Sequence, residues 1–441
     1  MSSLLFLLLL SFVTGTVCAS TNGPLEEQWN MTFDEEDDNY VSNVMITGSG
    51  NYLVAGTMGI SAINTDNDAF LYNIGPNGTL IWSSVFGGEQ ADQFTEIIDV
   101  KDGGYVAVGN TFSYSPSGVS AWMVKVDQNG DELWNKTFFD GSYSFAYSAQ
   151  QTSDEGFVLV GIYNAWSPLA MILKTDSEGV EEWSKTFGLG GLYNYDNFQS
   201  VKETPDGGFI MAGNTLSYSS SRLTDGWLVK VDSNGDELWN RTFGDVDIDV
   251  LSSVFVTSGG EYIAVGKSKL YGESLFNGII VKTDSNGTIL WEKRYFEGSD
   301  SSFNSIMSDT DDNYIVGGAV GQVPDGSVTA SFGVDRYDAV LLKIDGDGEE
   351  IWNQTYDGYY SSSFNSIAGS NGLYVAAGDE RSYEVNEKDG LIVLYTDPEL
   401  QEEEVTEDET SSQTTEEKSP LSLTVTLASI GLSFFALRKR L

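Results

Sequence analysis

The fold is decided by one stretch of the chain, Phe198-Gln-Ser-Val-Lys-Glu-Thr-Pro-Asp-Gly-Gly-Phe-Ile-Met-Ala-Gly213, and by its continuation, Gly226-Trp-Leu-Val-Lys-Val-Asp-Ser-Asn-Gly-Asp-Glu-Leu-Trp239. Two clusters of turn-forming residues interrupt it. Asp206-Gly-Gly and Ser233-Asn-Gly each lie between two runs rich in β-forming residues. Gly and Asn accept positive φ angles, so such clusters between apolar runs are typical of tight hairpins. The stretch therefore predicts four short antiparallel strands, with a tight turn after the first and after the third.

The same unit recurs along the chain and is marked by seven tryptophans that lie 49 to 61 residues apart: Trp29, Trp82, Trp134, Trp183, Trp239, Trp291 and Trp352. A repeat of about 50 residues belongs to a solenoid, an array or a propeller. The third strands, such as Trp122-Met-Val-Lys-Val and Met171-Ile-Leu-Lys-Thr, are near-continuous apolar runs, which indicates burial on both faces. A four-stranded sheet covered on both sides by its neighbours is a propeller blade.

The two ends of the repeat region are incomplete in complementary ways. The last third strand, Leu391-Ile-Val-Leu-Tyr-Thr-Asp397, has no tryptophan-bearing fourth strand after it, whereas the N-terminal run from Leu25 to Phe33 is a fourth strand without a blade. Pairing the two closes the ring and removes two sheet edges that would favour aggregation. The sequence therefore predicts an all-β fold over residues 20–397, a seven-bladed β-propeller closed by an N-terminal strand.

The repeat also carries motifs of a known kind. The Asp-x-Asn-Gly-x-x-x-Trp ending, as from Asp232 to Trp239, resembles the Trp-docked repeats of PQQ-type β-propellers. Together with Asp-Gly-Gly-Tyr-x-x-x-Gly, as from Asp102 to Gly109, it resembles secreted surface propellers of prokaryotes over roughly residues 25–397. The PQQ resemblance implies a quinoprotein dehydrogenase. That family typically has eight blades and a vicinal cysteine pair, and this chain departs from both features.

The two ends of the chain predict secretion and anchoring. Residues 1–19 combine an apolar core with the small-residue pattern Val17-Cys-Ala19, which is typical of a signal peptide cleaved after Ala19. Residues 398–419 form an acidic Thr-, Ser- and Glu-rich stalk whose composition cannot bury a core. Residues 420–441 are an apolar run ending in a basic cluster, which predicts a C-terminal transmembrane helix or a sorting tail that is replaced by a lipid. We therefore expect the propeller outside the cell, anchored in the plasma membrane by its C-terminus.

The composition excludes several kinds of chemistry. The chain has no histidine, and its one cysteine, Cys18, belongs to the predicted signal peptide. Disulfides, thiolate or histidine catalysis and His or Cys zinc sites are therefore excluded. The net charge of −44 repels nucleic acid and anionic membrane, and it suits calcium, high salt or basic partners. One strand position carries lysine in five blades, which indicates an architectural role beside an unidentified carboxylate: Lys125, Lys174, Lys230, Lys282 and Lys343.

The loops of a propeller divide between two faces. The two tight turns of each blade lie on one face, and the loops from strand two to strand three and from blade to blade lie on the other. In this chain the second face holds the length and the variety, so it is the predicted binding face. Exposed Tyr and Trp suit sugar stacking or protein recognition, and the alternative is that these rings pack loops onto the blades. The predicted ligand-binding residues are Tyr114, Trp166, Tyr193, Tyr195, Asp196, Tyr218, Tyr359 and Tyr360.

Acidic residues and sequons supply further candidates. Asp245, Asp247 and Asp249 alternate along one loop, and such oxygen clusters coordinate calcium, although a solvated acidic loop has the same composition. A second set of aspartates recurs in the hairpins and is interpreted as turn caps: Asp127, Asp176, Asp232, Asp284 and Asp345. Six Asn-x-Thr sequons predict N-glycosylation, and the alternative is simple β-strand alternation: Asn30, Asn77, Asn135, Asn240, Asn286 and Asn353.

Three functional hypotheses remain. The leading one is a non-catalytic binding or adhesion protein of the cell surface that presents the long-loop face to a glycan or a protein, with calcium as a candidate cofactor. The first alternative is a carboxylate-based glycoside hydrolase or polysaccharide lyase, because paired acids suffice for glycosidic cleavage. A PQQ-type quinoprotein is the weaker alternative. Nucleic acid is not an expected partner.

Overall fold

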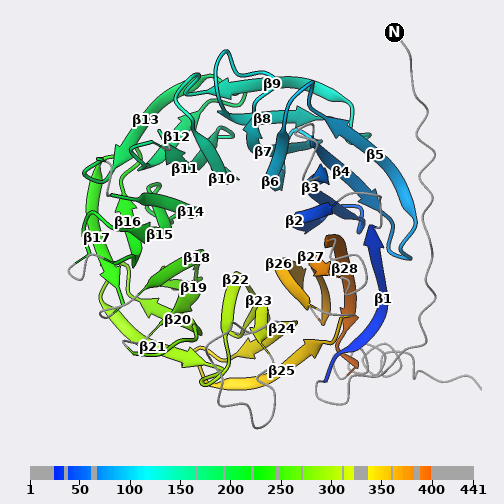
Figure 1. Cartoon of the computed structure of the whole chain (residues 1–441), viewed down its shortest axis with the longest axis vertical. Coiled ribbons are helices and arrows are strands. Elements are labelled where there is room, and N and C mark those ends of the chain that lie inside the picture. The colour runs from blue at the N-terminus through cyan, green and yellow to red at the C-terminus, as the bar shows by residue number, and fades with distance from the viewer. Residues whose placement is uncertain are drawn as a thin grey trace, which may run out of the picture. The chain divides into compact units, whose positions relative to one another are not determined.

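The computed structural model describes residues 24–33, 38–60, 67–164, 166–191, 194–219, 223–244, 248–269, 272–309, 312–321, 336–358, 361–370, 372–381 and 388–398. These residues form 28 strands, which are arranged as seven four-stranded antiparallel sheets around a ring (Figure 1). Within this part of the chain, no helix has the length and apolar character that a membrane crossing requires. The predicted signal peptide, stalk and C-terminal segment lie outside the described residues.

Six blades each take four consecutive strands. Blade 1 contains β2 (Asp38–Ile46), β3 (Tyr52–Ile60), β4 (Asp68–Ile74) and β5 (Leu80–Phe86), and blade 2 contains β6 (Asp92–Asp99), β7 (Tyr105–Thr111), β8 (Ser120–Val126) and β9 (Glu132–Phe138). Blade 3 contains β10 (Phe145–Gln151), β11 (Phe157–Tyr163), β12 (Leu169–Thr175) and β13 (Glu181–Phe187), and blade 4 contains β14 (Asp196–Glu203), β15 (Phe209–Thr215), β16 (Asp225–Val231) and β17 (Glu237–Phe243). Blade 5 contains β18 (Asp249–Val256), β19 (Tyr262–Ser268), β20 (Asn277–Thr283) and β21 (Ile289–Tyr295), and blade 6 contains β22 (Ser301–Ser308), β23 (Tyr314–Gly321), β24 (Tyr337–Ile344) and β25 (Glu350–Tyr356). The first strand of each blade is innermost and the fourth lies on the circumference (Figure 1).

Blade 7 combines the two ends of the repeat region. It contains β26 (Ser361–Ser370), β27 (Leu373–Arg381) and β28 (Lys388–Thr396), and β1 (Glu26–Phe33) is its outer strand. β1 pairs antiparallel with β28, from Glu26 opposite Thr396 to Phe33 opposite Gly390. Just before β1, the backbone of Leu25 exchanges hydrogen bonds of 3.0 and 3.2 Å with the side chain of Gln354 in blade 6. The predicted all-β, seven-bladed propeller closed by an N-terminal strand is confirmed.

The hairpin turns have the geometry that the glycines predict. In blade 4, Gly207 and Gly235 both have a φ of 77°, and their amides donate to the carbonyls of Thr204 (2.8 Å) and Asp232 (3.0 Å). The Asp232 carboxylate also accepts the amides two and four residues ahead, at 2.8 and 3.0 Å. The same pair of bonds recurs in four other blades, which confirms the interpretation of these aspartates as turn caps: Asp127, Asp176, Asp284 and Asp345.

The repeat tryptophans join neighbouring blades. Trp183, on the outer strand of blade 3, packs against Gly235 in a turn of blade 4, where a Cβ would lie 2.5 Å from the indole ring. The indole N–H of Trp239 donates to the carbonyl of Ser285 in the corresponding turn of blade 5, at 3.2 Å. A tryptophan and a turn glycine therefore recur together because the outer strand of one blade docks on the third-to-fourth turn of the next, at six of the seven junctions between blades. The same packing joins Trp29 to Gly78, Trp82 to Gly130, Trp134 to Gly179, Trp239 to Gly287 and Trp291 to Gly348.

The recurring lysines find their carboxylates in the first turn of the same blade. Lys230 is buried, and its Nζ lies 3.0 Å from Asp206 Oδ1 and 2.9 Å from the carbonyl oxygen of Val231. Both contacts offset the desolvation of the ammonium group, which would otherwise be costly to bury. Equivalent pairs are Lys125 with Asp102, Lys174 with Asp154, Lys282 with Glu261 and Lys343 with Asp309. A fivefold arrangement of this kind is part of the framework.

Candidate functional site

The connections between strands lie at opposite ends of the sheets. In blade 4, the first-to-second and third-to-fourth connections are hairpin turns that span 204–208 and 232–236, and they define what we call the tight-turn face. The second-to-third connection runs from 216 to 224, and the connection to blade 5 runs from 244 to 248. These connections and their equivalents define the long-loop face. The division is the one that the sequence predicts, and each face offers a candidate site.

Two predicted ligand-binding residues, Tyr114 and Tyr218, occupy equivalent positions on the long-loop face of blades 2 and 4. The ring centroid of Tyr114 lies 5.6 Å from that of Trp122, and the centroid of Tyr218 lies 5.4 Å from that of Trp227. The Tyr114 hydroxyl donates to the carbonyl of Gly87 at 2.8 Å. Burial, with nearby carboxylates, raises the pKa of both tyrosines, so both hydroxyls stay protonated donors. Each tyrosine packs its loop onto the blade and yet remains exposed, so both interpretations of these rings apply.

Blade 3 carries the most exposed large hydrophobic side chains in the described part of the chain. Trp166, between β11 and β12, is 70% exposed, and Leu189, between β13 and β14, is 69% exposed. Trp166 meets Tyr143 edge to face, with ring centroids 5.5 Å apart. Tyr195, at the entrance to blade 4, is exposed as well. We call Tyr114, Trp166, Leu189, Tyr195 and Tyr218 the aromatic arc, since four of its five members are aromatic.

Hydrogen bonds between loops hold the centre of the aromatic arc together. The amide of Gly191 donates to the Ser167 hydroxyl at 2.6 Å, which links the two long loops of blade 3. The amide of Leu189 donates to the Ser217 hydroxyl at 3.0 Å, which links blade 3 to the loop of blade 4 that carries Tyr218. The long-loop face of blades 3 and 4 is therefore one bonded surface.

Asp196, a predicted ligand-binding residue, lies beneath that surface. It is fully buried at the start of β14. Its carboxylate accepts the Thr215 hydroxyl (2.5 Å), the amides of Leu216 (3.2 Å) and Ser217 (3.1 Å), and the Ser217 hydroxyl. These bonds take up its acceptor positions, so Asp196 holds the loop that carries Tyr218. Asp92 bonds the equivalent loop of blade 2 in the same way, through the amide and hydroxyl of Ser113.

The predicted calcium site is described only in part. Asp245 and Asp247 lie outside the described residues, as do three predicted ligand-binding tyrosines, Tyr193, Tyr359 and Tyr360. Asp249 is buried at the start of β18, and a Cβ on Gly244 would lie 1.9 Å from its Oδ2. Among the residues that the structure does describe, no three His, Cys, Asp or Glu side chains are grouped so that they could hold a metal ion.

The innermost strands line a central channel of about 290 Å³. Each of them has a β-bulge, which in β14 lies between Phe198 and Ser200, so that two successive side chains, Gln199 and Ser200, both line the channel. The residue after the bulge accepts an amide of the next blade, as Ser200 Oγ accepts the amide of Val254 at 3.2 Å. The same link joins Asn43 to Ile97, Glu96 to Ala149, Ser148 to Val201 and Ser366 to Val44. These polar side chains therefore tie the blades together around the axis.

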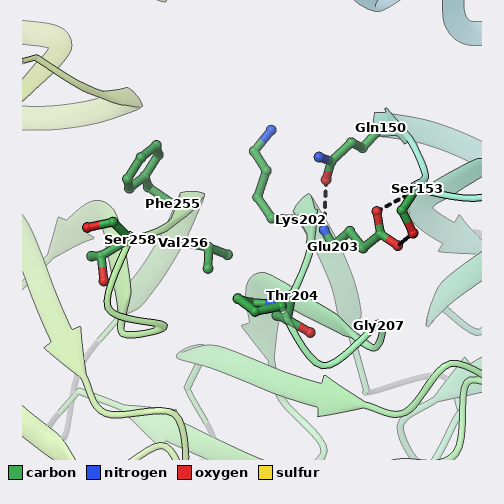
Figure 2. Close-up of a pocket in the computed structure, with 11 residues that line it drawn as sticks. Gln150, Ser153, Lys202, Glu203, Thr204, Gly207, Phe255, Val256 and Ser258 are labelled. Carbon is green, nitrogen blue, oxygen red and sulfur yellow. Dashed lines mark hydrogen bonds between the residues drawn. The ribbon is translucent and has the colours of Figure 1, made fainter. Parts of the chain in front are cut away.

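The tight-turn face has a cavity that sequence reasoning missed. It measures about 590 Å³ and lies among the first turns of blades 3, 4 and 5 (Figure 2). The backbone amide of Glu203 donates to Gln150 Oε1 at 2.7 Å. The Glu203 carboxylate accepts hydrogen bonds from the amide and the hydroxyl of Ser153, both at 2.7 Å. Lys202 extends away from this bonded group (Figure 2). It also lines the central channel. Three repeats contribute to the cavity at equivalent positions, so no single motif in the sequence marks it.

A smaller cavity, of about 230 Å³, lies on the long-loop face between blades 6 and 7. Asp379 lines it, and its carboxylate accepts Asn365 Nδ2 at 2.7 Å and lies 3.6 Å from Lys388 Nζ. Burial raises the pKa of Asp379 even though these two partners act in the opposite direction. Blade 7 is irregular here, because Asp379-Glu-Arg381 stands where blade 4 has Asn214-Thr-Leu216. The sequence shows this charged triplet but not that it borders a cavity.

All six sequon asparagines lie within the described residues. Four are on outer strands, and each donates its side-chain Nδ2 to the glutamate three residues earlier, at 2.5 or 2.6 Å: Asn30, Asn135, Asn240 and Asn353. The other two, Asn77 and Asn286, are exposed in the third-to-fourth turns of blades 1 and 5. Each of the six is at least partly accessible to solvent.

Comparison with known proteins gives structural likeness without a family. No family model matches the chain, and no curated protein matches it. A protein of unknown function from Dyadobacter fermentans aligns with a TM-score of 0.45 and 11% identity, over 85% of this chain and 99% of its own. Sqt1 from Chaetomium thermophilum aligns with a TM-score of 0.45 and 12% identity, over 84% of this chain and 99% of its own. A member of the DUF4221 family from Bacteroides vulgatus aligns with a TM-score of 0.40 and 12% identity, over 86% of this chain and 99% of its own. The assignment as a seven-bladed propeller therefore rests on the sheet topology of this chain itself.

Proposed function

We propose that this chain is a non-catalytic binding protein of the cell surface, which presents the long-loop face of its propeller to a glycan or protein ligand. The aromatic arc is the observation that carries the proposal. Exposed apolar side chains that gather on one face of a soluble domain are typical of interaction sites. Tyr and Trp supply large contact areas at a low cost in conformational entropy, which suits recognition.

The loops beneath the arc support the same proposal. Asp196 fixes the loop of Tyr218, and the Ser167 and Ser217 hydroxyls bond the loops of blades 3 and 4 to one another. A surface whose loops are bonded in this way loses less entropy when a ligand binds. The N-terminal apolar segment, the acidic stalk and the C-terminal apolar segment of the sequence favour an extracellular, anchored location.

The test uses the full chain, purified from the cells that make it and immobilised through its C-terminus. It is probed with a polysaccharide panel and with cell-surface protein fractions, first in calcium and then after EDTA. We expect saturable binding that Trp166→Ala weakens by about tenfold or more, as is usual when a central aromatic anchor is truncated. Loss of binding after EDTA would add calcium to the site.

Leu133→Ala is the matched control. Leu133 is also exposed, at 57%, but it is the bulged residue of outer strand β9 and lies away from the long-loop face. Binding that both substitutions reduce equally, or that neither reduces, would contradict the assignment to the long-loop face. If the wild-type chain binds nothing in any arm, the proposal of a binding protein fails.

A second candidate, a carboxylate-based glycoside hydrolase or lyase, is favoured by one observation. Asp379 is a carboxyl group with a raised pKa that lines a cavity, and such a group suits general acid catalysis. We expect this candidate, if correct, to shorten a polysaccharide in the same panel, and we expect Asp379→Asn to abolish the cleavage. Unchanged chain lengths across the panel would remove the enzyme from consideration.

A further inference from the structure

The six sequons are distributed over the blades in a regular way with one exception. Blades 1, 2, 4, 5, 6 and 7 each carry one sequon, and blade 3 carries none. Blades 2, 4, 6 and 7 carry it on the outer strand, at Asn135, Asn240, Asn353 and Asn30. Blades 1 and 5 have Ser83 and Glu292 at that strand position, and their sequons lie in the adjoining turn instead. A blade that lacks the strand sequon is therefore supplied with a turn sequon, except in blade 3.

Blade 3 has the same local structure as its neighbours at the place where its sequon is missing. Ser184 stands at the strand position and donates its hydroxyl to Glu181 Oε1 at 2.8 Å. In blade 2, Asn135 Nδ2 donates to Glu132 Oε1 at 2.6 Å, from the same position. The turn of blade 3 has Glu178 where the blade 1 turn has Asn77. The framework thus accommodates a sequon in blade 3 at either place.

Exposed apolar side chains are concentrated on the blade without a sequon. Trp166 and Leu189 lie on its long loops, and Val180, 55% exposed, lies at the other end of β13. On the outer strands of other blades, Leu133 and Leu238 have similar exposure and are the bulged residues beside the repeat tryptophan, so the strand geometry accounts for them. Val85 and Ile289 are exposed as well, at 54% and 49%, but neither matches the exposure of Trp166 or Leu189. Blade 3 has Glu182 at that bulge. Its exposed apolar residues are therefore at positions that the repeat does not require.

We infer that the outer edge and long loops of blade 3 form a docking surface for a protein with a basic surface around an apolar centre, and that the glycans of the other six blades leave this sector uncovered. The inference rests on the proposed function and names its sector and its partner class. From Val180 to Leu189 the surface spans roughly 30 Å along the extended chain, which matches the width of a typical interface of about 800 Å² per partner.

The chemistry of the sector favours a protein over the alternatives. Leu189 and Val180 have no ring that could stack on a sugar, whereas the buried centre of a protein interface is more apolar than the rest of the surface and is enriched in aromatic residues such as Trp166. The rim carries Glu178, Glu181 and Glu182, all exposed. Glu182 is paired with Lys174, and Lys185 on the same strand is paired with Asp236, so Glu178 and Glu181 leave the rim with a net negative charge that attracts a basic partner. A second copy of this chain, with the same acidic rim and a net charge of −44, is repelled.

The experiment introduces a glycan into blade 3 of the full chain, produced in its own cells. Ser184→Asn creates the sequence Asn-Lys-Thr at 184–186, which is the blade 2 sequon at 135–137 moved to the equivalent position. The matched control is the double variant Ser184→Asn/Thr186→Ala, which has the same asparagine and no sequon. A photoreactive benzophenone residue, which keeps an aromatic ring at the anchor position, replaces Trp166 in the otherwise unchanged chain and in both variants. In a reference chain it replaces Leu133 instead. Irradiation on the cell surface and mass spectrometry then identify the adducts and the glycans.

We expect glycans at the six natural sequons, and an adduct at position 166 with a protein that is basic at neutral pH. The glycan at position 184 should reduce the yield of this adduct by tenfold or more, whereas the double variant should retain it and the probe at position 133 should not give it. An adduct with a carbohydrate or with a second copy of this chain, an adduct that persists beside the glycan, or six unmodified sequon asparagines would overturn the inference. The absence of an adduct at position 166 in a chain that still binds a ligand from the panel of the proposed function would overturn the inference but leave the proposed function standing, and a chain that binds nothing would end both.

Discussion

The closure of the ring by β1 leads to a quantitative prediction for Phe33→Ala. The Phe33 side chain is 6% exposed, and its ring centroid lies 5.2 Å from that of Tyr72 and 6.2 Å from that of Phe70, both in blade 1. A Cβ on Gly390 would lie 2.9 Å from the ring, so no space is left on that side. The substitution removes a buried aromatic side chain and leaves a cavity, which should lower the free energy of unfolding by about 3–5 kcal/mol.

Phe243→Ala provides the comparison for this experiment. Phe243 occupies the same strand position in blade 4 and is equally buried, but its strand is covalently continuous with the rest of its blade. A propeller of this length gains roughly 0.8 kcal/mol per kelvin in unfolding entropy, so both variants should lose about 4–6 °C in Tm, measured by circular dichroism. Phe33→Ala should in addition scatter light well below its Tm, because a detached β1 exposes the edge of β28. A loss of less than about 1 °C for Phe33→Ala, or equal scattering from both variants, would refute the role of β1 in closure.

Two further substitutions test the framework. Gly235→Ala should lower the free energy of unfolding by roughly 2–5 kcal/mol in a urea titration, because the new methyl group meets the Trp183 ring and the residue keeps a positive φ. Gly207→Ala, with open space around it, should lower that free energy by only about 1–2 kcal/mol. Equal losses in the two variants would contradict the docking of Trp183. Burial raises the pKa of Asp206, but its hydrogen bonds and Lys230 more than offset this, so the folded pKa lies below 3.8. The stability that this ion pair contributes is present above pH 3.8 and is lost as the pH falls through the pKa of Asp206 in the folded protein. Asp206→Asn should therefore flatten the decline of the urea midpoint below about pH 4. A urea midpoint that declines as in the wild type would count against the ion pair.

Much of the fold is predictable because its signals are local. Asp206-Gly-Gly and Ser233-Asn-Gly determine their own turns through positive φ angles and carboxylate caps, and they therefore fix where the strands end. The closure was predictable because β1 and β28 each lack a partner that an antiparallel sheet needs. The bulges of the innermost strands were not predicted. The Ser200 hydroxyl that follows the bulge in β14 accepts the amide of Val254, and because the two residues belong to different repeats, no pattern within one repeat shows this contact.

The candidate site was predictable in position but not in detail. The sequence assigns length and variety to one face, and the exposed Trp166 and Tyr195 lie there. It also counts Asp196 among the ligand-binding residues, because an acid beside a tyrosine has the composition of a surface loop. The carboxylate is instead buried by the hydroxyls and amides that follow β15, about 20 residues later in the sequence. Burial of this kind depends on which loop returns to cover the residue, and composition does not contain that information.

The sequons show how the two kinds of information combine. Asn-x-Thr on an outer strand has a structural explanation, since Asn135 bonds Glu132 and its threonine continues the strand alternation. Ser184 makes the corresponding bond in blade 3, so the strand does not require asparagine. Blades 1 and 5 carry Asn77 and Asn286 in exposed turns, where strand alternation does not apply. The turn asparagines have a structural explanation too, because the hairpin motif also places asparagine at this turn position in blades 2 and 4, as Asn129 and Asn234. What makes these two asparagines of blades 1 and 5 sequons is Thr79 and Thr288, which stand where blades 2 and 4 have Asp131 and Asp236. This placement of threonine favours the prediction that glycans cover six blades and leave the edge of blade 3 bare, and mass spectrometry of the sequon asparagines tests it.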